Sequence, residues 1–194
     1  MDAFAWDERY QSTDHLWSVG PNLFVADRLG PAKPGTGIDV AGGEGRNAIW
    51  LASRGWKMSS VDFSSEAVAR GEARGSEVDF VVADVLAWEP EETVDLVLIA
   101  YLQLLPAEFG TMVKRSRGWL APGGEIFMIG HDVSNIERGH GGPQAPEILW
   151  DIDVIVDHLE GLTILESQVV RRPVETDEGT AYALDALVRA RQPN

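Results

Sequence analysis

The sequence contains no cysteine among its 194 residues, and its formal charge is −15, from 31 acidic and 16 basic side chains. The lack of thiols excludes disulfides and thiolate metal sites. Nucleic acids and anionic membranes both bind basic surfaces, so the acidic balance predicts neither as a partner. We interpret the excess of acid as a feature that favours solubility.

Long apolar runs are also missing. No stretch approaches the roughly 18 apolar residues that a membrane-spanning helix requires. The N-terminus, from Met1 to Glu8, is acidic and lacks the basic-then-apolar order of a signal peptide. A cytoplasmic protein is therefore the simplest expectation. With 44% hydrophobic residues to supply a core, the length suits a single domain that spans residues 1–194.

The strict dinucleotide spacing G-x-G-x-x-G is absent, yet residues 36–47 contain a glycine-rich turn. A short β-prone run ends at Asp39, and a helical pattern follows the turn. The small residues of the turn are Ala41, Gly43 and Gly45. Glycines allow the backbone to turn sharply and to approach a ligand, and free N–H groups at a helix start can hold an anionic group. Strand, turn and helix in this order predict the first unit of a nucleotide-binding α/β sheet.

Aspartates follow three successive predicted strands, as Asp39, Asp62 and Asp84. A carboxylate at the end of the second strand can accept hydrogen bonds from both hydroxyls of a ribose. It would repel a 2′-phosphate, which disfavours NADP. Taken singly, each aspartate has an ordinary explanation as a loop residue or a helix cap. Three of them in register favour a ligand-binding edge of the sheet.

The turn resembles motif I of the class I S-adenosylmethionine (SAM)-dependent methyltransferases, in which an acidic residue opens D-x-G-x-G-x-G. Ala41 replaces the first glycine of that motif. The run Trp6-Asp7-x-x-Tyr10 and the L-x-P-G-G run at residues 120–124 extend the resemblance, which is to small-molecule enzymes of the thiopurine and tellurite-resistance type. Residues 121–124 of the second run are expected to form a tight turn. It implies a Rossmann-like fold with a seven-stranded, mostly parallel sheet, helices on both faces and a C-terminal antiparallel hairpin.

The resemblance implies SAM as cofactor and S-adenosylhomocysteine as product. The implied cofactor-binding residues are Trp17, Asp39, Ala41, Gly43, Gly45, Asn47, Asp62, Phe63, Ser64, Asp84, Val85, Ala100 and Tyr101. Within this set, Phe63 would flank the adenine and Asp84 would meet its amino group. Ser64 is also a good helix N-cap. Trp6, Tyr10 and Trp17 could cover the cationic sulfonium or pack a terminal helix onto the sheet, and both interpretations remain open.

The segment after the fifth predicted strand, residues 131–147, is polar and rich in glycine. A loop of this length is usually functional, and we expect it to close over the substrate. His131 and His140 are therefore catalytic candidates, together with Tyr101 at the end of the fourth predicted strand. A metal site is disfavoured, because His131 and Asp132 are adjacent and the spacing to His140 is loose.

Four parts are expected within the domain: an N-terminal cap (1–35), the SAM-binding core (36–130), the substrate-side loop (131–147), and a C-terminal helix with a β-hairpin (148–194). The helix is predicted at 148–159 and the hairpin strands at 162–170 and 180–189, joined by a polar turn at 175–179.

The predicted function is methyl transfer from SAM to a small-molecule acceptor by in-line displacement, in a monomer or homodimer. An NAD-dependent oxidoreductase shares the strand, turn and acid pattern. The chain lacks its third glycine spacing, a second domain, and a Lys four residues after Tyr101. A non-catalytic SAM-binding sensor is the third possibility.

Overall fold

A computed structural model describes residues 3–12 and 20–194, which form two compact units that meet in sequence between Leu98 and Ile99. The strands belong to one seven-stranded sheet with the order β3-β2-β1-β4-β5-β7-β6. Strands β1, β2 and β3 pair in parallel, whereas β7 pairs antiparallel with both β5 and β6. The mostly parallel sheet and the C-terminal antiparallel hairpin confirm the predicted fold class.

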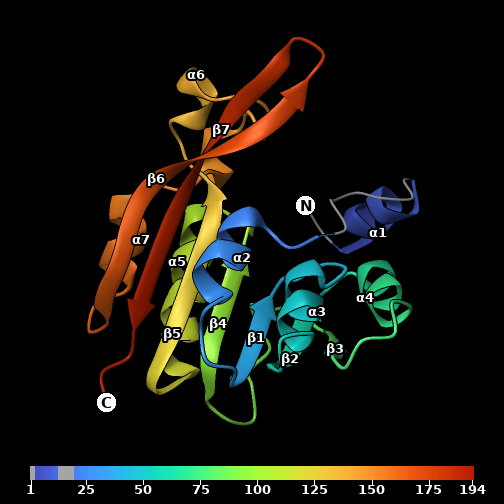
Figure 1. The fold of residues 1–194 in the computed structure, drawn as a ribbon, viewed down its shortest axis with the longest axis vertical. Helices are drawn as coiled ribbons and strands as arrows, with labels where there is room; N and C mark the ends of the chain where they lie inside the picture. The colour runs from blue at the N-terminus through green and yellow to red at the C-terminus, as the bar shows by residue number, and fades with distance from the viewer. Residues whose placement is uncertain (1–2, 13–19) are drawn as a thin grey trace. The chain divides into compact units, whose positions relative to one another are not determined.

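The first unit contains short strands that alternate with helices (Figure 1). Its elements are α1 (Ala3–Gln11), α2 (Leu23–Leu29), β1 (Thr36–Val40), α3 (Arg46–Ala52), β2 (Lys57–Asp62), α4 (Ser65–Glu72), β3 (Asp79–Val82) and the larger part of β4 (Val94–Ala100). In the register of β1 with β2, Asp39 lies opposite Ser60 and Val40 opposite Val61. Asp39 and Asp62 therefore lie at the same edge of the sheet, as the parallel pattern predicted.

Local capping explains where two of these helices begin. The Asn22 side chain accepts hydrogen bonds from the backbone N–H groups of Phe24 and Val25 at the start of α2. At the start of α4, the Ser64 hydroxyl accepts one from the N–H of Ala67, at 3.1 Å. Such caps satisfy N–H groups that have no partner within the helix, and each stabilises a helix by about 1 kcal/mol. The predicted N-cap role of Ser64 is confirmed.

The second unit is dominated by long strands. Its elements are α5 (Pro106–Gly118), β5 (Leu120–His131), α6 (Asn135–Arg138), the 3-10 helix η1 (Pro146–Ile148), α7 (Ile152–His158), β6 (Thr163–Thr176) and β7 (Gly179–Arg191). Both hairpin strands are longer than the sequence predicted, because β6 and β7 pair continuously up to Thr176 and Gly179. The predicted five-residue turn is therefore shortened to two residues.

Two predicted boundaries in this unit differ from the observed ones. The expected tight turn at 121–124 lies within β5, where Gly123 adopts a φ of +75°. The C-terminal helix starts at Ile152 rather than 148, because Trp150 forms a bridge to Asp132 and exchanges backbone hydrogen bonds with the segment after β5. Asp151 then caps α7 by accepting from the N–H of residue 153 at 2.9 Å.

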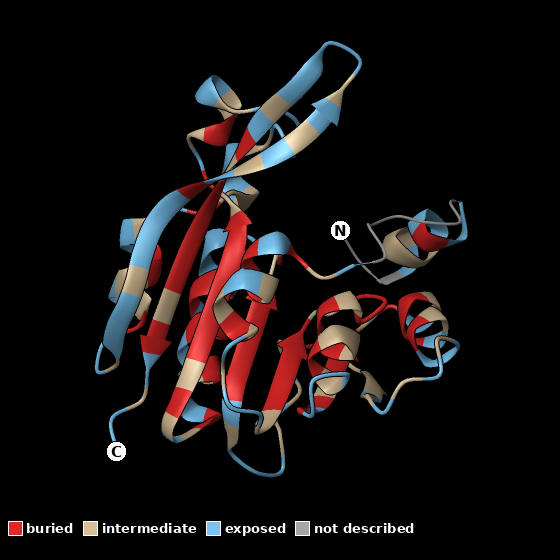
Figure 2. Cartoon of the chain, viewed as in Figure 1, coloured by how far each residue is buried: buried red, intermediate tan, exposed pale blue. Residues whose placement is uncertain are grey.

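Burial follows the order of the strands (Figure 2). In that view β1 and β5 are buried over most of their length, while β6 is largely exposed. Residues 126–129 of β5 and 186–188 of β7 form a fully buried apolar layer within the second unit. Across the described ranges, no helix has the length and apolar character that a membrane span requires.

Candidate functional site

The carboxylate of Asp62 lies at the glycine turn, at the end of β2. Its Oδ2 accepts a hydrogen bond from the N–H of Gly43 at 2.9 Å, and its Oδ1 accepts one from the N–H of Ser64 at 2.9 Å. Burial raises the pKa of Asp62, and the two backbone N–H groups oppose that rise. Each carboxylate oxygen keeps a further lone pair. The group can therefore accept two more hydrogen bonds, which is what a pair of neighbouring hydroxyls would donate.

Asp39, at the end of β1, is more deeply enclosed. Its Oδ2 accepts from the N–H of Ala48 in α3 at 3.2 Å. Its Oδ1 is buried and has no hydrogen-bond partner in the part of the chain that the structure describes. Burial raises the pKa of Asp39 to about 7. The carboxyl group is thus divided between its neutral and ionised forms near neutral pH.

The turn between these two carboxyl groups has a left-handed backbone at three alternate residues. The φ angles are +53° at Ala41, +58° at Gly43 and +69° at Gly45. A Cβ on Gly45 would lie 2.6 Å from the Phe80 ring, and one on Gly43 would lie 2.6 Å from the Tyr10 hydroxyl. Gly43 and Gly45 are therefore each required for two reasons: the left-handed conformation and the close approach of an aromatic side chain. At the third position, Ala41 adopts the same conformation at a steric cost.

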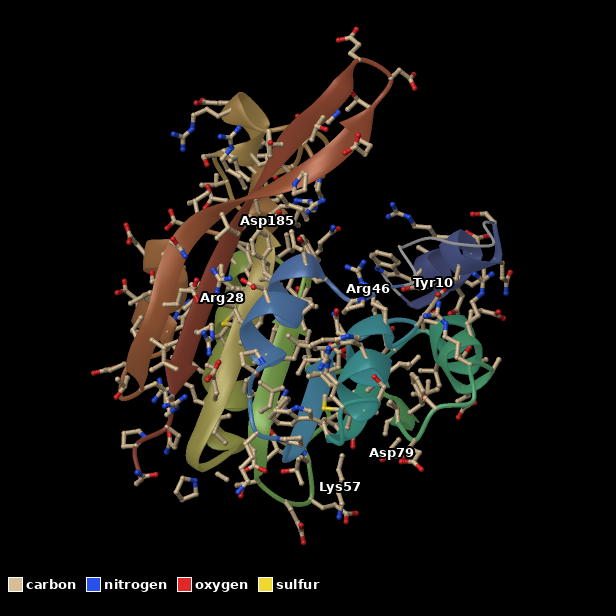
Figure 3. All side chains as sticks on the ribbon, in the orientation of Figure 1. Tyr10, Arg28, Arg46, Lys57, Asp79 and Asp185 are labelled. Atoms are coloured by element: carbon tan, nitrogen blue, oxygen red, sulfur yellow. The ribbon has the colours of Figure 1, made fainter. Side chains whose placement is uncertain are left out.

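Helix α1 packs against α4 beside this turn. Asp7 accepts hydrogen bonds from the Ser64 hydroxyl at 2.5 Å and from the N–H of Glu66 at 3.3 Å, both at the start of α4. Arg70 donates to the carbonyl of Tyr10 at 2.6 Å. In Figure 3, Tyr10 and Arg46 lie at the end of the first unit opposite Lys57. The hydroxyl of Tyr10 lies against Gly43 of the glycine turn.

A polar cluster in the second unit joins four elements around Asp185 of β7, whose side chain is fully buried. Tyr101, just after β4, donates its hydroxyl proton to Asp185 Oδ2 at 2.6 Å. Arg172 of β6 donates its Nε–H to the same oxygen at 2.7 Å and to the Tyr101 hydroxyl at 3.0 Å. His131, which ends β5, places Nδ1 3.3 Å from Asp185 Oδ1. We call these residues, Tyr101, His131, Arg172 and Asp185, the Asp185 cluster.

Within the Asp185 cluster, the negative charge of Asp185 is in direct contact with the positive charge of Arg172. Burial alone would raise the pKa of Asp185, but the adjoining His131, Arg172 and Tyr101 hold that pKa below its ordinary value. Burial and the Asp185 charge raise the pKa of Tyr101, so the phenol remains a hydrogen-bond donor. Tyr101 also has a φ of +57°, which is unusual for a residue other than glycine.

Comparison with known proteins shows which protein family the chain resembles. Residues 38–124 match the family model described as a methyltransferase domain. In this segment and in its fold, the chain resembles the class I SAM-dependent methyltransferases. SAM is the methyl donor of this family.

The known proteins that this chain is similar to are distant relatives. A segment of 96 residues is 34% identical to trans-aconitate 2-methyltransferase from Methylobacterium radiotolerans, covering 48% of this chain and 36% of the relative. The chain thus spans about a third of the length of that curated relative. The structure of the N-methyltransferase NodS from Bradyrhizobium japonicum WM9 with S-adenosyl-L-homocysteine has a TM-score of 0.74 at 21% identity, covering 100% of both chains. TehB from Haemophilus influenzae has a TM-score of 0.72 at 17% identity, covering 98% of this chain and 66% of the other.

The structure places the predicted cofactor-binding residues in different surroundings. Asp39, Ala41, Gly43, Gly45, Asp62 and Ser64 meet at the glycine turn. Asn47 instead accepts from the backbone N–H of Asn22 at 2.9 Å, and Asp84 is exposed and accepts from Leu86 in its own turn. Phe63 and Ala100 are half-buried and Val85 is buried. Trp17 lies outside the described residues.

Of the predicted catalytic residues, Tyr101 and His131 belong to the Asp185 cluster. The rings of Tyr101 and His131 lie 5.0 Å apart between their centroids. His140 is exposed in the loop, which is held to β7 because Asn135 donates to the carbonyl of Gly141 and accepts from the N–H of Leu184.

Sequence reasoning missed Arg172 and Asp185. A signal was available: Asp185 interrupts an otherwise apolar strand, and a buried carboxylate requires a partner.

Proposed function

We propose that the protein transfers a methyl group from SAM to a small-molecule acceptor by in-line displacement. The observation that supports this proposal best is the Asp62 carboxylate, which is held at the glycine turn by the N–H groups of Gly43 and Ser64. This arrangement fits a ribose, because a fixed carboxylate can accept from two adjacent hydroxyls.

The donor set of the first unit also fits the rest of such a cofactor. Phe63 and Asp84 follow the ends of β2 and β3, where they would contact the adenine ring and its amino group. Ala41, Gly43 and Gly45 provide a turn without bulky side chains, and Tyr10 would close it. Bound SAM supplies a methyl group that is already activated on a sulfonium. The remaining task of the protein is to orient the acceptor and to exclude water, and orientation can provide several kcal/mol of the rate enhancement.

On the acceptor side, Tyr101, His131 and His140 are the proposed catalytic residues. An acceptor that loses a proton on methylation needs a base, and an imidazole suits that role near neutral pH. Two features support a small acceptor. The curated relative is named for trans-aconitate, and the net charge of −15 disfavours nucleic acid. We further propose a cytoplasmic protein that acts as a monomer or a homodimer.

Calorimetric titration with SAM, S-adenosylhomocysteine and NAD tests the proposal. We expect micromolar binding of the two adenosyl compounds and no binding of NAD. The Asp62→Asn variant loses charged hydrogen bonds to the ribose, each contributing about 1.5 kcal/mol or more, so its affinity should fall by roughly tenfold to a hundredfold. Asp79→Asn is the matched control, because it removes an exposed carboxylate at the start of β3.

The outcomes separate the candidate functions. Binding of NAD alone would overturn the assignment in favour of hydride transfer. Binding of the adenosyl compounds that Asp62→Asn leaves unchanged would show that the ribose lies elsewhere.

A further inference from the structure

Within the Asp185 cluster, the Arg172 guanidinium donates hydrogen bonds only through its Nε–H group. Its Nε–H points inward, to Asp185 at 2.7 Å and to the Tyr101 hydroxyl at 3.0 Å. The two terminal nitrogens carry four more N–H donors, and these make no hydrogen bond to any residue in the described ranges. The side chain as a whole is 26% exposed.

The way in which Arg172 is held differs from an ordinary buried ion pair. Arginine and carboxylate usually pair through two parallel N–H···O bonds. Here Asp185 Oδ2 receives Arg172 and Tyr101 together, whereas Oδ1 is buried without a hydrogen-bond partner among the described residues and faces His131 Nδ1 at 3.3 Å. The guanidinium carbon also lies 5.6 Å from the Tyr101 ring centroid. Asp185 and Tyr101 therefore fix the inner edge and leave the outer fork available.

Other arginines of the hairpin are committed to structural pairs. Arg189 donates to Glu125 at 2.7 Å and to Glu166 at 3.4 Å, and Arg191 donates to the same Glu125 at 3.3 Å. The Arg171 guanidinium lies over the Tyr182 ring at 4.1 Å. Arg172 differs from these because its partners leave its terminal nitrogens open beside two candidate catalytic residues, Tyr101 and His131.

We propose that the outer edge of Arg172 binds a carboxylate group of the methyl acceptor, with Asp185 and Tyr101 as positioning residues that hold the guanidinium. This inference rests on the proposed methyltransferase function and names the substrate class of the same protein. A guanidinium fork matches the two oxygens of a planar carboxylate. The guanidinium is positively charged and has no acceptor, so it would repel a cationic amine group. In a protein with a net charge of −15, an anionic acceptor requires a specific cationic contact of this kind.

The backbone of Tyr101 is consistent with a functional role for the cluster. A tyrosine with a φ of +57° costs about 1 kcal/mol or more, and such strain concentrates at ligand sites. The N–H of Tyr101 donates to the carbonyl of Ile129 at 2.7 Å, which helps to hold this conformation. In this backbone conformation, the Tyr101 hydroxyl contacts both Asp185 and Arg172.

Side-chain NMR of the arginine Nε–H group tests the proposal without knowledge of the natural acceptor. The probes are benzoate, its neutral analogue benzamide, and inorganic phosphate. We expect benzoate to shift the Arg172 Nε–H signal saturably at millimolar concentration, and benzamide to leave it unchanged. Arg172→Lys, which keeps the charge beside the buried Asp185 but loses the fork, assigns the signal. Arg171→Lys, one residue away on β6, is the matched control and should retain the response.

Turnover provides a second readout. S-adenosylhomocysteine release is measured with hydroxy acids, amino acids and their amides as acceptors. We expect only carboxylates to be methylated, with KM raised at least tenfold in Arg172→Lys and unchanged in Arg171→Lys. Three results would overturn the carboxylate assignment. They are an Arg172 signal that benzoate does not shift, a larger shift with phosphate than with benzoate, and turnover of the amides.

Calorimetric titration of S-adenosylhomocysteine into the same samples separates the two proposals. If it binds while benzoate leaves the Arg172 signal unmoved, the carboxylate site is wrong and the methyltransferase assignment stands. If it does not bind, the proposed function fails, and the NMR titration still decides whether Arg172 binds carboxylates.

Discussion

The shifted ionisation of Asp39 has a measurable consequence for stability. Its carboxyl group has a pKa of about 7 in the folded protein, because burial disfavours the charged form, against 3.8 for an unperturbed aspartate. Below pH 4 the group is protonated in both the folded and unfolded states. Between pH 4 and 7 the unfolded chain releases the proton and the folded protein keeps it. Stability is therefore lost as the pH rises through this window.

The size of the loss follows from the shift. One pKa unit corresponds to about 1.4 kcal/mol, so a displacement of roughly three units implies a loss of about 4 kcal/mol. The part that lies above pH 5 is about 3 kcal/mol. Asp39→Asn cannot ionise, and its amide oxygen can still accept from the N–H of Ala48. The free energy of unfolding of the variant minus that of the wild type should therefore be about 3 kcal/mol larger at pH 8 than at pH 5.

Urea denaturation followed by tryptophan fluorescence, repeated from pH 4.5 to 8.5, checks this prediction. The relevant quantity is the difference in free energy of unfolding between the variant and the wild type at each pH. Groups that do not interact with Asp39 titrate alike in both proteins and cancel in that difference. Asp79→Asn serves as the exposed control. Parallel curves for wild type and Asp39→Asn would refute the reasoning, because they would show that the Asp39 carboxylate is solvated or paired.

Two further substitutions test the surroundings of the glycine turn. Ala41→Gly should raise the free energy of unfolding by up to about 1 kcal/mol, since relief of the left-handed strain exceeds the entropy that glycine adds to the unfolded chain; urea denaturation would measure it, and a loss of stability would show that Ala41 is not strained. Asp7→Asn weakens the contacts with Ser64 and Glu66, so hydrogen exchange in α1 should accelerate by roughly threefold to tenfold with little change in global stability. Unaltered exchange would mean that Asp7 does not hold α1 on α4.

Local chemistry made the first unit predictable. A left-handed turn requires glycine at positions 43 and 45, and a helix start requires a cap such as Ser64. Parallel strands align their carboxyl ends, so a sequence with Asp39 and Asp62 after successive strands predicts two carboxyl groups at one edge. Each of these inferences needs only a few neighbouring residues and a general rule of topology.

The boundaries that were predicted incorrectly involve contacts between distant segments. Trp150 lies in an apolar pattern that is typical of a helix, yet its backbone pairs with residues 131–133 and its indole N–H donates to the carbonyl of Leu102 at 3.0 Å. Apolar periodicity reports which side chains are buried and carries no information about a backbone partner 17 or more residues away. The late start of α7 follows from that pairing.

The sequence by itself determined the fold class, because turn sterics, helix capping and strand order depend on short segments of the chain. It did not determine the Asp185 cluster. Tyr101 precedes Asp185 by 84 residues and Arg172 by 71. The registers of β7 with β6 and with β5, and the hydrogen bond from the Tyr101 N–H to the carbonyl of Ile129, bring the three side chains together. These registers are set by pairing along long strands, which is a property of the folded sheet. The glycine turn could therefore be predicted from the sequence, whereas the candidate acceptor site was decided by tertiary structure.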